Sequence, residues 1–355
     1  MVRLDYIVFS TVFLLYGFGL HAAPVAATDA PQRSDDDLIH VEPGVFVQGS
    51  PKSELNRFAN ERQFAVSLPY PIRVGRTEVT QAQWLKYVDR NPSYFANCGP
   101  DCPVDSVSWY ETLNYLNLRS AAEGLSPCYQ LEQCSGVMGA PCLDRKKHQP
   151  SCQGTYQCKI VNLIGPTCSG YRLLTESEWE YVARAGTTEV HYGMTSGIDL
   201  DKIAHYGLHA VVSDMGLSCA DGNDRCGPTR VARYAPSAWG HFDFHGNVRE
   251  WVWDGFARYP LGSSVLPRRD AGLMRVVRGT SFRSSRDEFR VALRGRLSPT
   301  DKNAEVGFRV VRVLTPAAMQ PTKSQQPPAH SVPDQGVPDE IRVPPGQPIR
   351  ITPTP

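Results

Sequence analysis

The sequence predicts a single α+β domain that is rich in loops and cross-linked by disulfides. Three observations support this fold class: short runs with strand-like alternation, three segments that open with helix-capping motifs, and ten cysteines in a chain of 355 residues. Gly/Pro turns separate the runs. The formal net charge of +1 creates no one-signed field, so charge indicates neither nucleic acid nor an anionic membrane as a partner.

The two ends of the chain are predicted to flank this domain. Residues 1–27 have the features of a secretory signal peptide, with a basic residue before an apolar run and small residues after it. The run is shorter than the roughly 20 apolar residues of a membrane-spanning helix. We therefore expect an exported protein, periplasmic or extracellular, with no stable membrane anchor, and a linker over residues 28–37.

The C-terminal segment 315–355 is predicted to be a disordered tail. Eleven prolines fall within the forty residues from Pro316 to Pro355, mixed with Gln, Ser and Thr. Such a composition buries too little apolar surface to offset the entropy of ordering the chain. The folded domain is therefore expected over residues 38–314.

Two strand-like runs precede the first predicted helix. Leu38 to Val47 alternates well enough for a strand, with Pro43-Gly44 as a turn or bulge, and Arg76 to Val79 is a second short run.

Three capping boxes predict three helices. In each box a Ser or Thr caps the helix while a Glu or Gln three residues later reaches back to it. The boxes are Thr80 with Gln83, Ser108 with Glu111, and Thr175 with Glu178, and the last two helices are expected to end near Gly124 and Gly186. Apolar residues at helical spacing are expected to anchor the helices in the core; they include Trp84, Val88, Trp109, Leu113, Leu116, Trp179, Val182 and Ala183.

Ten cysteines in an exported chain favour disulfides over a reduced metal cluster, because the compartment is oxidising. No paired C-x2-C spacing supports a zinc ribbon. Six cysteines fall in residues 126–169, which show little periodicity and which we interpret as a disulfide-stapled insertion or long loop. The sequence leaves the pairing of the cysteines open.

Arginine is concentrated near the end of the predicted domain. Nine arginines fall between Arg268 and Arg296, against three carboxylates. A nucleic-acid groove could have this composition, but an exported protein rarely meets nucleic acid. We therefore expect these arginines to pair with carboxylates from elsewhere in the chain, and we expect no nucleic-acid partner.

Seven motifs, in order, resemble the formylglycine-generating-enzyme (sulfatase-modifying-factor) family. They are Val41-Glu-Pro-Gly-Val-Phe-Val-Gln-Gly49, Arg76-Thr-Glu-Val-Thr-Gln81, Pro103-Val-Asp-Ser-Val-Ser-Trp109, Tyr171-Arg-Leu-Leu-Thr-Glu-Ser-Glu-Trp-Glu-Tyr181, Ala238-Trp-Gly240 with Gly246-Asn-Val-Arg-Glu-Trp251, Arg278-Gly-Thr-Ser281 and Gly307-Phe-Arg309. They cover roughly residues 38 to 314. The resemblance implies a loop-rich α+β fold related to C-type lectins, with a substrate or partner groove lined by its C-terminal third.

The copper site of the oxygen-using family members does not carry over to this chain. In those members two cysteines shortly after a Gly-Gly-Ser-like turn bind copper(I), which requires soft thiolates. Here the turn is Gly279-Thr-Ser281, and the following residues, Phe282 to Phe289, include no cysteine. The nearest cysteines in sequence, Cys219 and Cys226, are expected to pair with each other. We therefore expect neither bound copper nor formylglycine-generating oxidase activity.

The resemblance also implies a structural calcium site at Asp243, Gly246, Val248 and Glu250. Two carboxylates and two backbone carbonyls would supply the hard oxygen ligands that calcium prefers. In the alternative interpretation, Glu250 pairs with an arginine and Asn247 holds a turn.

Two histidine pairs, His205-x3-His209 and His241-x3-His245, have a spacing that would place both imidazoles on one face of a helix. Iron or another divalent ion could use such ligands. The second pair lies in a glycine-rich turn region, where this spacing does not place both imidazoles on one face. In the alternative interpretation these histidines bind no metal, and the sequence leaves the iron hypothesis open.

Two functions from different classes remain. The chain is either a binding module that presents a lectin-like surface to a polypeptide or a glycan, or an enzyme with altered metal-dependent oxidative chemistry that matures a peptide or protein substrate. No catalytic residue is assigned, because Ser281, Ser284 and Ser285 lack a nucleophile-elbow motif. The missing copper cysteines and the arginine-rich segment favour the binding module.

Overall fold

The computed structural model describes residues 37–142, 151–165, 167–191, 200–207, 227–265 and 272–313. The predicted signal peptide, nearly all of the linker and the proline-rich tail lie outside these residues. Within them, no helix is both long enough and apolar enough to cross a membrane.

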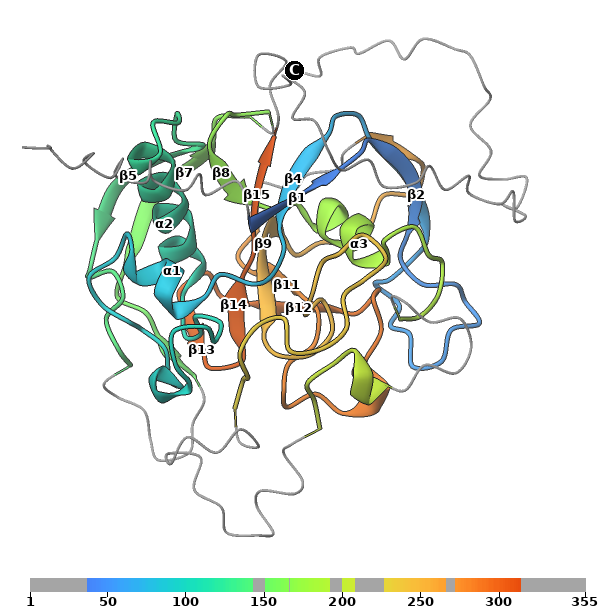
Figure 1. Cartoon of the computed structure of the whole chain (residues 1–355). Helices are drawn as coiled ribbons and strands as arrows, with labels where there is room; N and C mark the ends of the chain where they lie inside the picture. The colour runs from blue at the N-terminus through green and yellow to red at the C-terminus, as the bar shows by residue number, and fades with distance from the viewer. Residues whose placement is uncertain are drawn as a thin grey trace, which may run out of the picture. The chain divides into compact units, whose positions relative to one another are not determined.

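Two four-stranded sheets form the centre of the domain (Figure 1). The first has the order β1 (Leu38–Val41), β4 (Ile72–Gly75), β15 (Val310–Val313) and β8 (Tyr171–Leu173), with antiparallel neighbours. The second has the order β12 (Arg294–Leu297), β11 (Arg275–Arg278), β9 (Arg249–Gly255) and β14 (Val306–Phe308), in which β14 runs parallel to β9. Since β4 lies between β1 and β15, the first and last strands of the domain belong to one sheet.

The remaining strands form three smaller sheets. They are β10 (Ser264–Val265), β3 (Phe64–Leu68) and β2 (Gly44–Gln48); β13 (Asp301–Asn303) with β6 (Ser151–Gln153); and β5 (Tyr129–Ser135) with β7 (Gln157–Leu163). The predicted strand over residues 38–47 is therefore two strands, β1 and β2, which separate at the expected Pro43-Gly44 position.

The strand predicted at Arg76 to Val79 is wrong. The nearby strand, β4, lies four residues earlier, and the chain bends after it. Its backbone groups then bond to separate segments: Arg76 N donates to Asp37 O at 2.8 Å, and Val79 N donates to Phe308 O at 2.9 Å. The bend turns the Glu78 side chain into the interior, where it is 1% exposed.

All three predicted capping boxes are present. They open α1 (Gln81–Leu85), α2 (Trp109–Ala122) and α3 (Glu176–Arg184), and in each box both reciprocal hydrogen bonds form. The expected anchors Trp84, Trp109 and Trp179 are buried. Figure 1 shows α2 and the β5–β7 pair on one side of the central sheets and α3 on the other.

The described part of residues 126–169 contains strands rather than only loops. Tyr129 pairs with Leu163 and Leu131 with Val161, and these side chains pack on the core, while polar neighbours face solvent. This is the alternation of a half-buried strand.

The disulfide prediction is confirmed for eight of the ten cysteines. The pairs are Cys98–Cys102, Cys128–Cys168, Cys134–Cys158 and Cys142–Cys152. Cys219 and Cys226 lie outside the described residues. Four disulfides indicate an oxidising environment.

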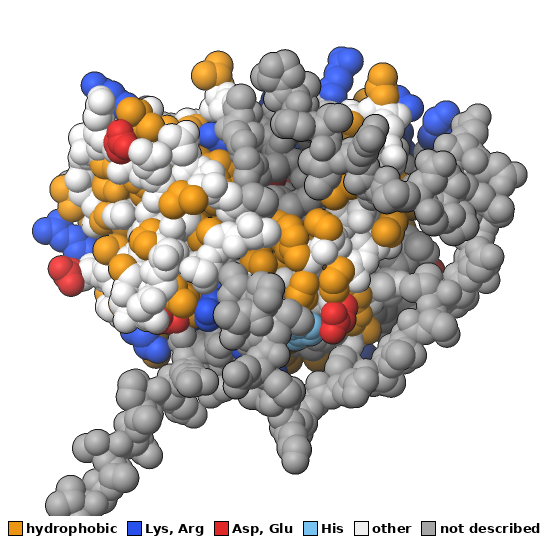
Figure 2. Space-filling model, turned by 90° about the horizontal axis from the view of Figure 1, so that it is seen from above, with side chains coloured by type: hydrophobic (Ala, Val, Ile, Leu, Met, Phe, Trp, Pro, Cys, Tyr) orange, Lys and Arg blue, Asp and Glu red, His pale blue; other side chains and the backbone are white. Residues whose placement is uncertain are grey.

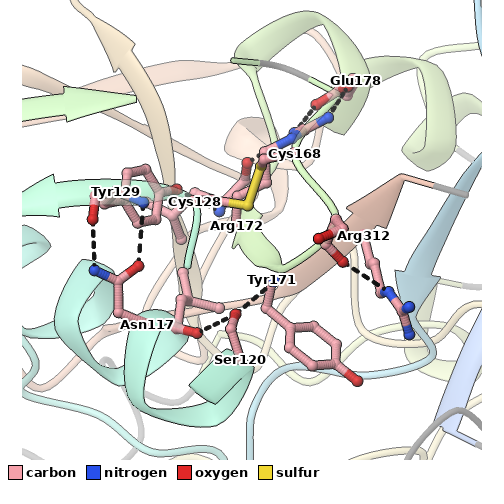
Figure 3. Close-up of a disulfide and its surroundings, with 12 residues drawn as sticks. Asn117, Ser120, Cys128, Tyr129, Cys168, Tyr171, Arg172, Glu178 and Arg312 are labelled. Atoms are coloured by element: carbon pink, nitrogen blue, oxygen red, sulfur yellow. Dashed lines mark hydrogen bonds and ion pairs between the residues drawn. A yellow bond between two sulfur atoms is a disulfide. The ribbon is translucent and has the colours of Figure 1, made fainter. Parts of the chain in front are cut away.

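The Cys128–Cys168 disulfide links the β5–β7 pair to the rest of the core (Figure 3). Beside it, Asn117 of α2 bonds to both backbone polar groups of Tyr129, and Ser120 Oγ accepts a hydrogen bond from Tyr171 N at 2.8 Å. The disulfide joins cysteines 40 positions apart. Cross-linking of such a loop stabilises a fold by roughly 4 kcal/mol in the chain-entropy model.

Candidate functional site

The turn after β11 packs directly on the loop that precedes β9. Phe282 N donates to Asn247 O at 2.8 Å, and Gly246 N donates to Thr280 Oγ1 at 2.9 Å. Gly246 and Asn247 have φ angles of 83° and 55°, a left-handed conformation that Gly and Asn tolerate best. A Cβ on Gly246 would also lie 2.3 Å from His205 O. Gly246 therefore allows this loop to pass close to the backbone of His205.

The family resemblance implies that this turn corresponds to the segment in which the oxygen-using enzymes carry their copper cysteines. Phe282 is fully buried, with its ring centroid 5.4 Å from that of Phe95. Ser281 Oγ, also buried, donates to Glu305 at 2.6 Å, and Ser284 Oγ accepts a hydrogen bond from Ser281 N at 3.1 Å. Burial keeps Ser281 from acting as an accessible nucleophile, so the segment is a packed turn.

Partly exposed charged side chains flank the turn, and one exposed aromatic ring packs on Phe95, which contacts Phe282 of the turn. Arg283 approaches Glu305 at 4.0 Å, and Arg249 approaches Glu288 at 3.7 Å; all four side chains are partly exposed. Tyr94, whose ring packs 4.8 Å from that of Phe95, is 43% exposed. We call Tyr94, Arg249, Arg283, Glu288 and Glu305 the Ser281 surface. It offers hydrogen-bond donors, acceptors and an aromatic face to a ligand.

The predicted calcium residues lie just behind this surface, but Glu250 has other partners. Arg309 binds Glu250 Oε1 through Nη2 at 2.8 Å, and Trp179 Nε1 donates to Glu250 Oε2 at 2.8 Å. The Glu250–arginine pair that the sequence left as an alternative is therefore present. Asn247 holds the turn, as that alternative also proposed, because its Oδ1 accepts a hydrogen bond from Thr229 N at 2.9 Å.

Asp243 interacts with a second buried carboxyl group that the sequence did not identify. Its Oδ2 accepts a hydrogen bond from Ala232 N at 2.7 Å, and its side chain is hydrogen-bonded to Glu78. Burial raises the pKa of Asp243 to about 6. Burial, reinforced by the Asp243 charge, raises the pKa of Glu78 well above its usual range. The two raised pKa values favour a protonated form of the pair, in which one carboxyl group donates a hydrogen bond to the other.

Both carboxylates of the predicted calcium set have protein partners. A cation at Glu250 would lie beside the Arg309 guanidinium, and Asp243 already shares a hydrogen bond with Glu78. Among the described residues, no three or more His, Cys, Asp or Glu side chains form a group that could hold a metal ion. Calcium at Asp243, Gly246, Val248 and Glu250 stays a prediction.

The described histidines of the two spaced pairs do not lie on helices. His241 and His245 lie in the loop before β9 and are buried, while His209 lies outside the described residues. His205 Nε2 contacts Gly227 O at 2.9 Å and Nδ1 contacts the Tyr234 hydroxyl at 3.2 Å. Burial lowers the pKa of His245 to about 3, so this imidazole is neutral.

The expected pairing of the arginine-rich segment with distant carboxylates is observed. Arg278 binds Glu180 at 2.6 Å, and Arg290 binds Glu61 at 2.6 Å. The sequence could not name these partners. The sequence contained a signal for Glu78, because this residue lies within the motif Arg76-Thr-Glu-Val-Thr-Gln81. It contained no signal for Tyr94 or Glu305.

Glu250→Ala should lower the free energy of unfolding by about 3–5 kcal/mol, because it leaves Arg309 buried without its carboxylate. The loss should be equal with and without a chelator in urea unfolding. The exposed control Glu42→Ala should change stability little. Chelator sensitivity that is present in the wild type and absent in Glu250→Ala would instead support the calcium site.

Asp243→Asn should change how stability depends on pH. The folded pKa of Asp243 lies above the unfolded value of 3.8, so its stabilising contribution is complete below about pH 4 and is lost as the pH rises through about 6. In chelator, the stability of the wild type relative to Asp243→Asn should fall by roughly 2–3 kcal/mol between pH 4 and 7. Urea unfolding at stepped pH measures this difference, and a difference independent of pH would contradict it.

Comparisons with known proteins give relatives over most of the chain. The chaperone protein LppX of Paenibacillus barcinonensis is 27% identical over 305 residues, which are 85% of this chain and 98% of LppX. The formylglycine-generating enzyme of Thermomonospora curvata is 30% identical over 152 residues, covering 40% of this chain and 50% of that enzyme.

A solved structure, Treponema denticola variable protein 1, matches with a TM-score of 0.60 and 28% identity over 78% of this chain and 95% of that protein. The family description "Sulfatase-modifying factor enzyme 1-like domain" matches residues 23–314, which include every strand and helix described above. The chain therefore belongs to the sulfatase-modifying factor enzyme 1-like, or formylglycine-generating-enzyme, family.

Proposed function

We propose that this protein is an exported, non-oxidase binding module that holds a polypeptide on the Ser281 surface. The main support is a packed turn in place of the copper cysteines. In this turn Phe282 is buried in the interior and Ser281 donates a hydrogen bond to Glu305. A thiolate copper site needs sulfur ligands, and this turn has none.

Similarity to LppX supports a polypeptide as the ligand. That relative is named a chaperone protein and is matched over 98% of its length, whereas the formylglycine-generating enzyme of Thermomonospora curvata is matched over half. We infer a shared role in binding exported polypeptides.

The chemistry of the surface also suits an extended polypeptide. Arg283 and Arg249 can donate hydrogen bonds to carbonyl groups, Glu288 and Glu305 can accept them from amides, and Tyr94 can pack on an apolar side chain. The formal net charge of +1 gives the whole molecule no one-signed field, and Figure 2 shows hydrophobic side chains interspersed with Lys and Arg and with Asp and Glu on the face seen from above. Binding would then depend on local contacts rather than on a long-range field.

Two alternative functions can each be tested separately. A glycan would use the same hydrogen-bonding groups, as a lectin-related fold would suggest, and glycan binding without polypeptide binding would favour it. An enzyme with altered metal-dependent chemistry requires a redox metal, so stoichiometric iron or copper in the purified protein would favour it.

Arg283→Ala and Tyr94→Ala should each weaken binding of a reduced, unfolded exported polypeptide by about tenfold, the loss expected for a contact that contributes 1–2 kcal/mol. Fluorescence anisotropy with a labelled polypeptide measures the affinity. Lys159→Ala, on the exposed face of β7, is the control and should bind as the wild type does. Equal affinity of all four proteins would exclude the Ser281 surface as the binding site.

Reduced, copper-loaded protein should not convert the cysteine of a sulfatase-type peptide to formylglycine, because no thiolate pair follows Ser281. Mass spectrometry of the peptide after incubation with oxygen detects the aldehyde. Turnover that disappears in Cys219→Ser or Cys226→Ser would contradict the proposal and place the chemistry at those cysteines.

A further inference from the structure

The Cys98–Cys102 disulfide lies at the edge of the Ser281 surface. Cys98 packs against the small apolar cluster of Phe95, Phe282 and Ala304, and Phe282 directly follows Ser281. The neighbouring Tyr94 belongs to the surface itself. A polypeptide held there would therefore have this disulfide within reach.

The two cysteines differ in exposure. Cys98 is partly exposed, with its Sγ 3.3 Å from Pro228 O, and it ends the short helix η2 (Ala96–Cys98), which has no buried residue. Cys102 is 2% exposed, and its backbone is fixed because its carbonyl accepts a hydrogen bond from Gln81 N at 2.9 Å. Of the two cysteines, Cys98 is the more exposed to an incoming thiolate, while Cys102 is the candidate leaving and resolving sulfur.

The other three disulfides of the described residues have clearer structural roles. Cys128–Cys168 spans 40 positions, and Cys134–Cys158 joins residues that pair across β5 and β7. Cys142–Cys152 spans 10 positions and attaches the chain to β6. Cys98–Cys102 spans four, so it restricts the unfolded chain least. Of these four disulfides, it therefore contributes least to stability in the chain-entropy model.

We propose that Cys98–Cys102 exchanges with thiols of a polypeptide bound at the Ser281 surface; this rests on the proposed function. A substrate thiolate attacks Cys98 Sγ, the disulfide breaks, and Cys102 leaves as a thiolate that takes up a proton. A second substrate thiolate then attacks the substrate sulfur of the mixed disulfide and releases Cys98. Two electrons pass from the substrate dithiol to the protein disulfide, which is the oxidant consumed, in one turnover.

The test uses the full mature protein in its oxidised form and a reduced, unfolded peptide with two cysteines. After quenching with an alkylating reagent, peptide mapping should find Cys98 and Cys102 labelled together with an equal amount of oxidised peptide. Labelling of this pair should be about tenfold faster or more than that of the other three disulfides. The Cys102→Ser variant, given the oxidised peptide, should accumulate a mixed disulfide at Cys98.

Anisotropy with a cysteine-free version of the peptide separates this inference from the proposed function. Binding of that peptide without labelling of Cys98 and Cys102 in the wild type overturns the exchange and leaves the binding module standing. Labelling that is equally fast in wild type and in Arg283→Ala also overturns the proposal, because exchange would then not depend on the surface. If Cys102→Ser fails to fold, the wild-type labelling rates decide the outcome.

Discussion

Buried pairing of arginine with glutamate is the interaction on which the rest of the domain depends. Glu176, at the start of α3, binds Arg294 of β12 at 2.8 Å and approaches Arg278 of β11 at 3.5 Å. Although burial opposes it, the charges of Arg294 and Arg278 lower the pKa of Glu176, so the carboxylate stays ionised. Removal of one partner from such a pair leaves an uncompensated buried charge. These pairs therefore fix the helix against the sheet.

The position of the Ser281 surface follows from these pairs. Arg278 is the last residue of β11 and is held by Glu180 and by two backbone carbonyls of the segment before β12. The turn begins at the next residue, so its geometry is set by a strand end that is fixed inside the protein. A neighbouring pair, Glu250 with Arg309, fixes β9 from behind.

Local signals in the sequence predicted the elements that depend on local interactions. The capping boxes at Thr80, Ser108 and Thr175 identified all three helices, because each hydrogen-bond pair forms within four residues. Pairings over long distances could not be predicted in this way. The partner of Glu250 is Arg309, 59 positions away, and a pattern of spacing does not specify such a contact.

The strands β5 and β7 were not predicted, for a different reason. The alternation from Tyr129 to Glu132 was a usable strand signal, but the cysteines drew the interpretation towards a stapled loop. The family resemblance predicted the fold correctly. The surroundings of the predicted calcium residues could not be predicted in this way, because side chains from distant parts of the chain contact them, as Glu78 does beside Asp243.

Amide hydrogen exchange of the protein, with and without a bound unfolded polypeptide, tests whether the Ser281 surface holds the ligand. Exchange should be slower at residues 93–98 and 279–289 in the complex, because these segments carry Tyr94, Arg283 and Glu288 of the Ser281 surface, and it should be unchanged in β5 and β7. Protection that is confined to β5 and β7, with none at residues 279–289, would contradict it.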